Sequence, residues 1–254
     1  MLDFIAAFME KVERYQPDFL VRGIITCDNT VYRIGTDTKV ISKVFELVVR
    51  PFVLEIASDH GLSVVEPKKQ NYYPDFTLMA GESDGEKIAV DVKTTYRRRL
   101  RADGSWSASF TLGGYTSFLR NETKNIVFAY SQYARHYIVG FIYDRAGSTS
   151  SRQIFTLSEL DQVPCPIRDV EFFVQEKYRI ASERPGSGNT ANIGSITGSS
   201  VVDFAAGKGP FAEAGEAVFV DYWRHYGTSA TGREYRNLQE YWNWKQTLHP
   251  QGER

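Results

Sequence analysis

The sequence has little cysteine, no excess charge and no long apolar run. Cys27 and Cys165 are its only two cysteines in 254 residues, which excludes a disulfide-stapled scaffold and fits a reducing cytoplasm. Thirty Lys and Arg face 31 Asp and Glu, and the net charge of -1 argues neither for nor against nucleic acid. No apolar run approaches the roughly 18 residues of a membrane span. Asp3 stands where a signal peptide carries Lys or Arg, so we expect a cytoplasmic protein with no membrane partner.

The composition is that of an ordinary globular domain. Apolar residues make up 42 % and charged residues 24 % of the chain. No repeat, low-complexity segment or linker marks a boundary, so residues 1–254 are expected to form a single domain with an ample core. Strand patterns mixed with helical patterns predict the α/β class with a mixed sheet.

Apolar spacing predicts the main elements. Helices are expected over residues 2–15, 37–60 and about 115–122, the second capped by Thr36 or Asp37 and interrupted or restarted at Pro51. Strands are expected over 75–79, 87–92, 137–143 and 170–180, with a hairpin over 20–34 that turns at Asp28-Asn29. Residues 185–210, rich in Gly, Ser, Thr and Asn, are expected as loop, and the aromatic tail 212–246 as partly helical.

One constellation of side chains indicates hydrolytic chemistry. Pro74-Asp75 opens one strand of a predicted hairpin, and Asp91-Val92-Lys93 follows after fifteen intervening residues, near the end of the other strand. Asp91 and Lys93 are two residues apart and therefore share a face. Two converging carboxylates repel each other unless a cation lies between them, and Mg²⁺ takes one or two carboxylates with water and phosphate oxygens. The alternative is a turn cap at Asp75 and a cross-strand salt bridge at Asp91 and Lys93.

A basic run follows the second acid. Lys93, Arg97, Arg98, Arg99 and Arg101 place five positive charges in residues 93–102. Such a run is either a solvated loop or a surface that meets a polyanion, and charge alone does not separate the two.

Seven stretches of the chain carry a resemblance. The stretches are 35–40, 45–47, 66–78, 88–96, 110–118, 186–190 and 221–224. Their order and approximate spacing match one family along most of the chain, from about residue 20 to 245. Together they resemble the EcoRV-like family of type II restriction endonucleases, which have the PD-(D/E)xK nuclease motif. The resemblance implies a restriction-endonuclease-like fold, with a central mixed β-sheet flanked by helices, in a U-shaped homodimer. It also implies N-terminal dimerisation elements and C-terminal DNA-binding elements.

The resemblance implies which residues carry the chemistry. Asp75 and Asp91 would bind Mg²⁺ with Glu46 as an accessory acid, and Lys93 would be the catalytic lysine. The reaction implied is in-line attack of water on the scissile phosphorus, with the metal lowering the pKa of the water and neutralising charge on the phosphate. Taken alone, Glu46 is better explained as a solvent-facing helix acid.

The resemblance also implies DNA contacts. Glycines in the loop 186–192 let the backbone approach base edges, and Asn can pair with adenine in the major groove. The implied contacts are Gly186, Ser187, Gly188, Asn189, Thr190 and Asn192 in this loop, Gln70 and Asn71 at the minor groove, and Thr38, Lys39, Thr111, Ser117 and Lys124 elsewhere. The implied site is GATATC, cut at its central TA step to blunt ends with 5′-phosphates. Lys69, Tyr72 and Ala191 depart from the family pattern.

Two alternatives remain open at this level. A repair or structure-selective nuclease would use the same acids on mismatches or junctions. A DNA-binding module without catalysis would keep the loop 186–192, although Asp75, Asp91 and Lys93 are all present. A restriction enzyme would also require a DNA methyltransferase in the host, which the chain does not reveal.

Overall fold

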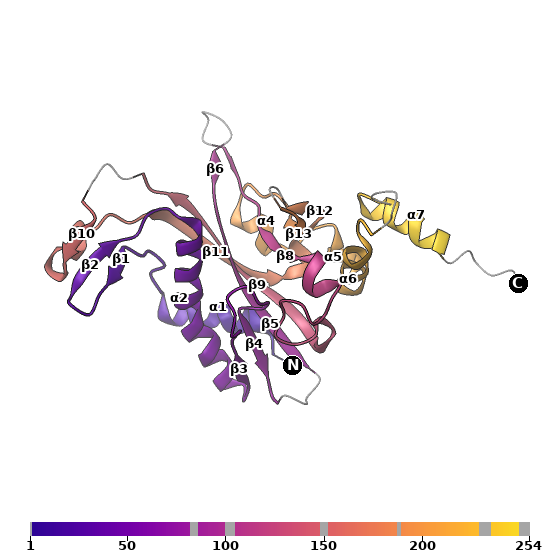
Figure 1. Ribbon diagram of the computed structural model, residues 1–254, viewed down its shortest axis with the longest axis horizontal. Coiled ribbons are helices and arrows are strands. Elements are labelled where there is room, and N and C mark those ends of the chain that lie inside the picture. The colour runs from indigo at the N-terminus through magenta and orange to yellow at the C-terminus, as the bar shows by residue number, and fades with distance from the viewer. Residues whose placement is uncertain are drawn as a thin grey trace, which may run out of the picture.

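A five-stranded mixed sheet forms the centre of the computed structural model, which describes residues 2–81, 86–99, 105–147, 152–186, 189–228 and 235–248 (Figure 1). The strand order is β11-β9-β5-β4-β3. β5 and β9 run parallel, and the other neighbours run antiparallel. The strands are β3 (Ser63–Val65), β4 (Phe76–Met79), β5 (Lys87–Tyr96), β9 (Tyr133–Arg145) and β11 (Ile167–Glu176). The predicted α/β class with a mixed sheet is confirmed.

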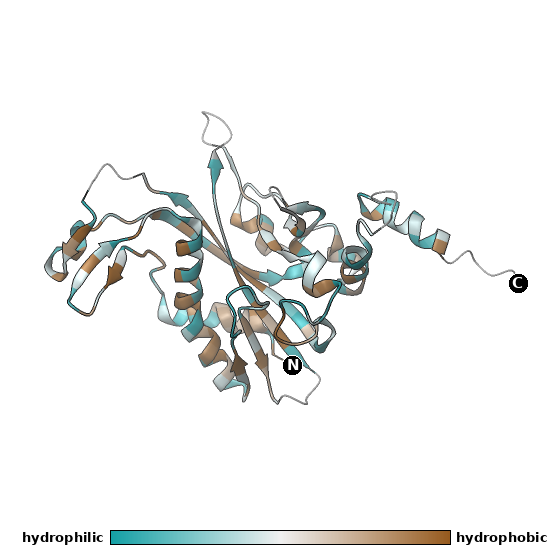
Figure 2. Ribbon diagram, in the orientation of Figure 1, coloured by the Kyte–Doolittle hydropathy of each residue, from teal (hydrophilic) through white to brown (hydrophobic). Residues whose placement is uncertain are grey.

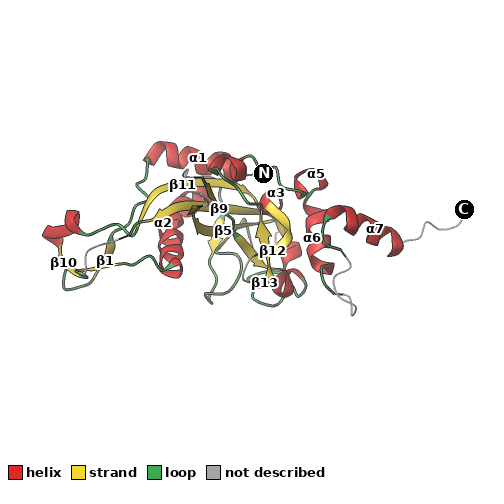
Figure 3. Ribbon diagram, turned by 90° about the horizontal axis from the view of Figure 1, so that it is seen from above, coloured by secondary structure: helices red, strands yellow, loops and turns green. Residues whose placement is uncertain are grey.

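Two helices cover one face of this sheet. α1 (Phe4–Tyr15) begins at Asp3, whose carboxylate accepts from the Ala6 N–H, and α2 (Thr38–Asp59) begins at Asp37 in the same way. Both bury a phenylalanine-rich stripe against the sheet, and α1 lies beside β11 (Figure 3). Figure 2 shows hydrophobic residues along the central strands and in bands on α2. Both predicted helices are therefore present, within one or two residues of their expected ends.

The expected break at Pro51 is wrong. α2 continues through Pro51 without interruption. Proline removes one backbone donor and so leaves the carbonyl four residues earlier, that of Leu47, without its helical partner. Leu47 and Pro51 both lie on the exposed side of α2, where water can satisfy that carbonyl. The buried stripe on the other side holds the helix together across the missing hydrogen bond.

The opposite face of the central sheet carries a second layer. A three-stranded sheet of order β12-β13-β8 lies here, beside a short helix, α4 (Val201–Ala205). Its strands are β8 (Thr111–Gly114), β12 (Ala181–Gly186) and β13 (Asn189–Ser195). The expectation of loop over residues 185–210 is thus wrong for most of that range. Backbone pairing of β13 with strands on both sides outweighs the low strand propensity of its Gly, Asn and Ser residues.

The aromatic tail forms three helices. They are α5 (Phe211–Ala214), α6 (Glu216–His225) and α7 (Leu238–Leu248), and α7 lies at one extreme of the molecule (Figure 1). The predicted partly helical tail is confirmed, and the rings of Tyr222, Trp223, Tyr226 and Tyr241 are buried in one cluster. Trp242 is instead exposed.

A small sheet lies apart from the centre, beyond α2 (Figure 1). Its order is β1-β2-β10, from β1 (Gly23–Ile25), β2 (Thr30–Arg33) and β10 (Ile154–Thr156). The predicted hairpin over 20–34 is confirmed, and β10 is an addition from far along the chain. A two-stranded sheet pairs β6 (Arg98–Arg99) with β7 (Trp106–Ser107). Short helices are η2 (Tyr130–Gln132) and η3 (Leu157–Gln162).

Two further expectations need adjustment. The helix expected over about 115–122 is one π-helical turn, η1 (Tyr115–Leu119), with Ser117 outside helical geometry. The strand expected over 170–180 ends at Glu176, and the chain turns into α3 (Lys177–Ile180) before entering β12. Among the described residues, no helix is long and apolar enough to cross a bilayer.

Candidate active site

The alternation of β5 sorts its side chains between the two layers. Ile88, Val90 and Val92 pack into the core beneath α1 and α2. Asp91 and Lys93 therefore point to the other face, toward the second layer. The Asp91 residue is only 3 % exposed, whereas the Lys93 side chain is 25 % exposed. Lys93 Nζ lies 2.5 Å from Asp91 Oδ2, so the predicted sharing of a face is confirmed and the pair is formed within one strand.

Asp75 reaches the same place from the neighbouring strand. It directly precedes β4, whose Phe76 pairs with Val90 of β5. Its Oδ2 accepts a 2.7 Å hydrogen bond from the backbone N–H of Val92. Burial raises the pKa of Asp75 well above its ordinary value, and the nearby charge of Asp91 raises it further. The hairpin thus brings the two predicted carboxylates together in an arrangement that resists double ionisation.

Lys93 offsets part of this negative charge. Burial lowers the pKa of its ammonium, but the carboxylates of Asp91 and Asp75 outweigh burial and leave that pKa raised. Lys93 is therefore protonated at neutral pH. A protonated lysine beside the carboxylates is suited to hydrogen-bond an anionic substrate and is not a base.

The two aspartates fit a hard divalent cation. Asp91 Oδ2 is buried and has no hydrogen-bond partner of acceptable geometry among the described residues, apart from its ion pair with Lys93. A buried oxygen of this kind is available as a metal ligand. Among the described residues, no three His, Cys, Asp or Glu side chains converge as a metal-holding group. Two carboxylates suit Mg²⁺ in particular, because this ion completes its shell with water and phosphate oxygens.

Glu46 approaches from the other side. It projects from α2 and lines the same cleft as Asp75, and its charge contributes to raising the pKa of Asp75, after burial and Asp91. Its carboxylate lies 2.5 Å from Lys43 Nζ. The structure therefore brings Glu46 near the two aspartates and binds it to a lysine of its own helix. Its accessory role remains a prediction.

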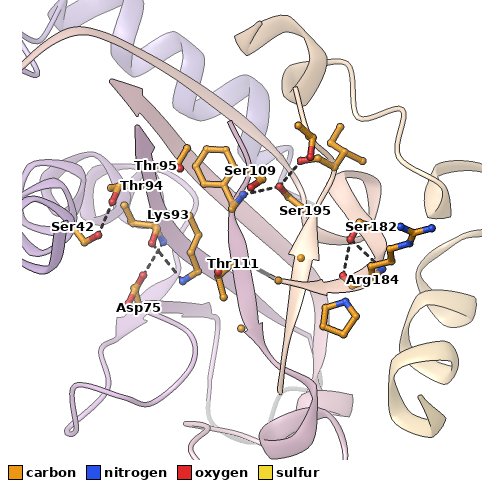
Figure 4. Close-up of a pocket in the computed structure, with 18 of the residues that line it drawn as sticks. Ser42, Asp75, Lys93, Thr94, Thr95, Ser109, Thr111, Ser182, Arg184 and Ser195 are labelled. Carbon is orange, nitrogen blue, oxygen red and sulfur yellow. Dashed lines mark hydrogen bonds between the residues drawn. The ribbon is translucent and has the colours of Figure 1, made fainter. Parts of the chain in front are cut away.

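A cleft of about 720 Å³ opens above these residues (Figure 4). Asp75, Lys93 and Thr94 lie on one wall, and a hydrogen bond of 2.6 Å between Ser42 and Thr94 ties α2 to β5 there. The other wall comes from the second layer. Its labelled residues are Ser109, Thr111, Ser182, Arg184 and Ser195. Polar side chains on both walls suit a charged, hydrated ligand that passes between the two layers.

Comparison with known proteins decides the family. A family model described as Restriction endonuclease EcoRV matches residues 15–246. The Type II restriction enzyme EcoRV of Escherichia coli is 44 % identical over 245 residues, which cover 95 % of this chain and 96 % of that protein. The chain belongs to the EcoRV restriction endonuclease family.

It is accordingly a type II restriction endonuclease of the EcoRV type, which acts on double-stranded DNA and depends on a divalent metal. The resemblance stated from the sequence is confirmed. The two open alternatives, a repair nuclease and a DNA-binding module without catalysis, give way to this assignment. The nuclease class also gives the pair of aspartates a substrate, because a phosphodiester is the charged ligand that the cleft and Lys93 suit.

The loop over residues 186–192, which is predicted to read base edges, joins β12 and β13 in this EcoRV family member. The hairpin of β12 and β13 is called the reading hairpin below. Gly186 at the end of β12 pairs with Asn189 at the start of β13. The backbone of Asn189 and Thr190 belongs to β13, while Ser187 and Gly188 lie outside the described residues. Across the sheet, Asn192 pairs with Gly114 of β8, and Gly194 pairs with Thr111. The hairpin therefore stands on a third strand, which carries Thr111.

A second cleft, of about 320 Å³, joins the predicted minor-groove segment to the aspartates. Its lining includes Gln70, Asn71, Asp75, Asp91, Ser117 and Asn192. Two of the departures from the family pattern meet at its edge, since Lys69 Nζ lies 5.3 Å from the centre of the Tyr72 ring. Lys69 and Tyr72 therefore form a cation–π pair.

The structure does not bring every predicted DNA contact to these clefts. Thr38 and Lys39 lie at the start of α2 and Lys124 lies beyond η1, outside the lining of both clefts. Their contact with DNA remains a prediction.

The basic run divides into residues with different roles. Arg97 donates to the Asp169 carbonyl and Glu171 and lies over the Trp106 ring, so its positive charge is committed to the fold. Arg98 is exposed and lines the large cleft. The side chain of Arg99 and all of Arg101 lie outside the described residues. Arg97 therefore fits neither of the two alternatives left open for the run, a solvated loop or a surface that meets a polyanion.

Sequence reasoning missed two residues of the cleft. Ser182 and Arg184 line its second wall, and the Ser182 hydroxyl donates 2.7 Å to the Arg184 carbonyl. Both stand only a few residues before the reading loop. No site was predicted over residues 181–184. A polar run that leads into a glycine-rich loop is nevertheless a usable signal of a segment that lines a binding cleft.

The Asp75 pKa predicts a pH-dependent cost to stability. Above the ordinary value of 3.8, the unfolded carboxyl ionises freely while the folded one resists ionisation, so stability falls as pH rises toward the folded pKa. In the absence of divalent metal at about pH 8, Asp75→Asn is expected to have a higher melting temperature than wild type. Each kcal/mol of unfolding free energy recovered should raise the melting temperature by about 2–4 °C. The difference should vanish below about pH 4, where both carboxyls are protonated. Equal melting temperatures in EDTA at both pH values would contradict this.

Proposed function

We propose that this enzyme is a homodimeric, Mg²⁺-dependent endonuclease that cuts the site GATATC at its central TA step. The products would be blunt ends with 5′-phosphates. The observation that carries the proposal is the meeting of Asp75, Asp91 and Lys93, of which Asp75 and Lys93 line the large cleft and all three line the second cleft. The reading hairpin forms the opposite wall of the large cleft. The match of the residues in 186–190 and 70–71 to the family pattern supports the recognition site, with Lys69, Tyr72 and Ala191 as its departures.

Each residue of the proposed active site has a different role in the reaction. A divalent cation, when bound, lowers the pKa of an attacking water and offsets charge on the phosphate. Asp75 and Asp91 would hold that cation. Lys93, kept protonated by its two acidic neighbours, donates a hydrogen bond to the phosphate and stabilises the charge that develops there. The cleft walls orient the duplex so that the scissile phosphate meets these groups in line.

An apolar face on the small sheet supports the homodimer. Ile24, Tyr32 and Ile154 are direct cross-strand neighbours, 54 %, 43 % and 52 % exposed. The other face of the sheet is closed by Val31 and Phe155 packed on Val163. A second copy of the chain would bury the exposed row, and a two-fold dimer matches a palindromic site with one active site for each strand.

The dimer is tested with Ile24→Asp combined with Ile154→Asp. We expect this variant to sediment as a monomer and to lose double-strand cleavage, because a charged face cannot be buried against its own copy. Val202→Asp is the matched control, since Val202 is an exposed apolar residue on α4, far from the small sheet. A double variant that still sediments as wild type would overturn the assignment of this face.

The activity and site are tested on a long plasmid. Incubation with Mg²⁺ should give discrete fragments, and sequencing should find half of GATATC at every end. EDTA should abolish cleavage, because the paired carboxylates then lack the cation that offsets the charge of the substrate. Ends that share a different palindrome would correct the site alone. Intact plasmid in Mg²⁺, Mn²⁺ and EDTA alike would contradict the nuclease assignment.

The proposed activity fixes the cellular setting. An enzyme that cuts this site would act in the cytoplasm, where it meets incoming DNA. The host would need a methyltransferase that modifies the same site. Methylated plasmid is accordingly expected to resist cleavage.

A further inference from the structure

Lys177 is a fully buried lysine behind the catalytic floor. It opens α3, the four-residue helix that joins β11 of the central sheet to β12, the strand that leads into the reading hairpin (Figure 3). The residue has 0 % of its surface exposed. Its Nζ has no hydrogen-bond partner among the described residues. An ammonium in this state costs several kcal/mol to bury, and such a cost is unusual where no function requires it.

Three aromatic rings enclose this ammonium. Nζ lies 4.3 Å from the ring centre of Tyr73, 4.9 Å from that of Phe118 and 5.6 Å from that of Tyr130. Cation–π attraction is strongest at such desolvated sites. The rings stack on one another, with 4.5 Å between the centres of Tyr73 and Phe118. The group of Lys177 with these three rings is called the lysine cage below.

The lysine cage joins segments that the proposed function places around DNA. Tyr73 lies between the minor-groove pair, Gln70 and Asn71, and the catalytic Asp75. Its hydroxyl is fixed by a 2.7 Å hydrogen bond with His136 Nδ1. Phe118 directly follows Ser117, another predicted DNA contact. A shift of α3 would therefore displace both the reading hairpin and the segment with Asp75 that directly precedes β4.

Gly113 shows how closely β8 approaches the lysine cage. Its φ is +103°, and a Cβ there would lie 2.8 Å from Phe118 Cζ and 3.9 Å from Lys177 Nζ. Only glycine fits this backbone against the ring. β8 in turn pairs with β13 of the reading hairpin, so the lysine cage touches the hairpin through a second strand.

The charges of the catalytic floor also act on Lys177 through space. Burial lowers its pKa to about 7, and the charge of Asp91 opposes that effect. The ammonium is thus close enough to sense the carboxylate. Lys177 lies outside the lining of both clefts and so does not touch the substrate.

We propose that Lys177 is a positioning residue that couples the reading hairpin to the catalytic aspartates through the lysine cage. The proposal rests on the proposed function. A correctly seated hairpin sets α3 and Lys177, and the rings carry that position to Tyr73 and thence to Asp75. A mismatched base would leave the hairpin displaced and the aspartates misaligned. The cleavage rate would then fall by a larger factor than the affinity for the duplex.

Lys177→Met tests this coupling. Methionine keeps the length and packing of the side chain and removes the buried charge, so the melting temperature should not fall. Affinity for the duplex, measured with Ca²⁺ in place of Mg²⁺, should stay within about threefold of wild type. The single-turnover cleavage rate should drop about 100-fold, as misplaced groups do. The ratio of cleavage rates between the true site and a one-base variant should fall at least about tenfold.

Lys87→Met is the matched control. Lys87 is also buried and lies over an aromatic ring, 4.9 Å from the centre of Phe128. It sits four residues before Asp91, at the opposite end of β5 from the clefts. We expect its variant to keep both the cleavage rate and the discrimination ratio. Tyr130→Leu, which removes one ring outside the lining of both clefts, should reproduce the Lys177→Met pattern in weaker form.

The outcomes separate the two proposals. The site found for wild type by sequencing its cut ends is used throughout, so absence of cleavage by wild type contradicts the proposed function. Lys177→Met that cuts and discriminates as wild type overturns the coupling alone. Parallel losses of melting temperature, affinity and rate also overturn it, because they indicate a structural role. Loss of rate and discrimination with intact binding supports it.

Discussion

Asp91→Asn is expected to lose DNA cleavage by more than about 1,000-fold while binding its site at least as tightly as wild type. Asparagine fills the same buried space, so the fold should be kept. It removes one of two negative charges that face the phosphate, which is why affinity should not fall. The measurements are single-turnover cleavage in Mg²⁺ and duplex binding in EDTA.

The control for Asp91→Asn is Asp144→Asn. Asp144 is another buried aspartate of the central sheet, on β9, and it pairs with Arg97 at 3.6 Å. It lies outside both clefts, so its replacement should lower stability and spare the cleavage rate of the folded enzyme. Wild-type turnover by Asp91→Asn would remove the assignment of the metal site. Equal losses in both variants would indicate damage to the sheet.

Asn189→Ala is expected to weaken recognition at the outer bases of the site. The predicted contact of an asparagine with adenine contributes about 1–3 kcal/mol of discrimination, or about 5- to 160-fold in each half-site. A dimer would lose two such contacts. The cleavage rate at the true site should fall, and cleavage at sites altered in that base should fall less. Competition between the true and altered duplexes measures both at once.

Asn243→Ala provides the comparison for Asn189→Ala. Asn243 is exposed on α7, where its amide oxygen accepts from Gln239, and it lines neither cleft. Its loss should change nothing in the competition assay. An Asn189→Ala enzyme with the site preference of wild type would remove the reading role of the hairpin tip.

Much of the site was predictable because its geometry is local. The two-residue spacing of Asp91 and Lys93 places both on one face of any strand, and the hairpin of β4 and β5 brings Asp75 beside them. Helix caps such as Asp37 are also local signals, which explains why the ends of α1 and α2 were nearly right.

The wrong predictions fall where contacts with distant segments, or exposure to solvent, determine the local structure. β13 contains Gly, Asn and Ser residues that favour loops, yet it pairs with β12 and β8. Pro51 reads as a helix break, yet α2 is held by its buried face. Arg97 reads as free charge, yet distant acids and a tryptophan ring bind it. Propensity is a weak signal when tertiary contacts compete with it.

The sequence by itself determined the α/β class, the two carboxylates and lysine, and the family, because each depends on residue order and short spacing. The tertiary structure alone decided that the reading hairpin stands on β8 opposite the aspartates, that the row Ile24, Tyr32 and Ile154 is left exposed, and that Lys177 is enclosed by three rings. Each of these joins segments separated by tens of residues, and the spacing along a chain does not encode which distant surfaces will be buried together.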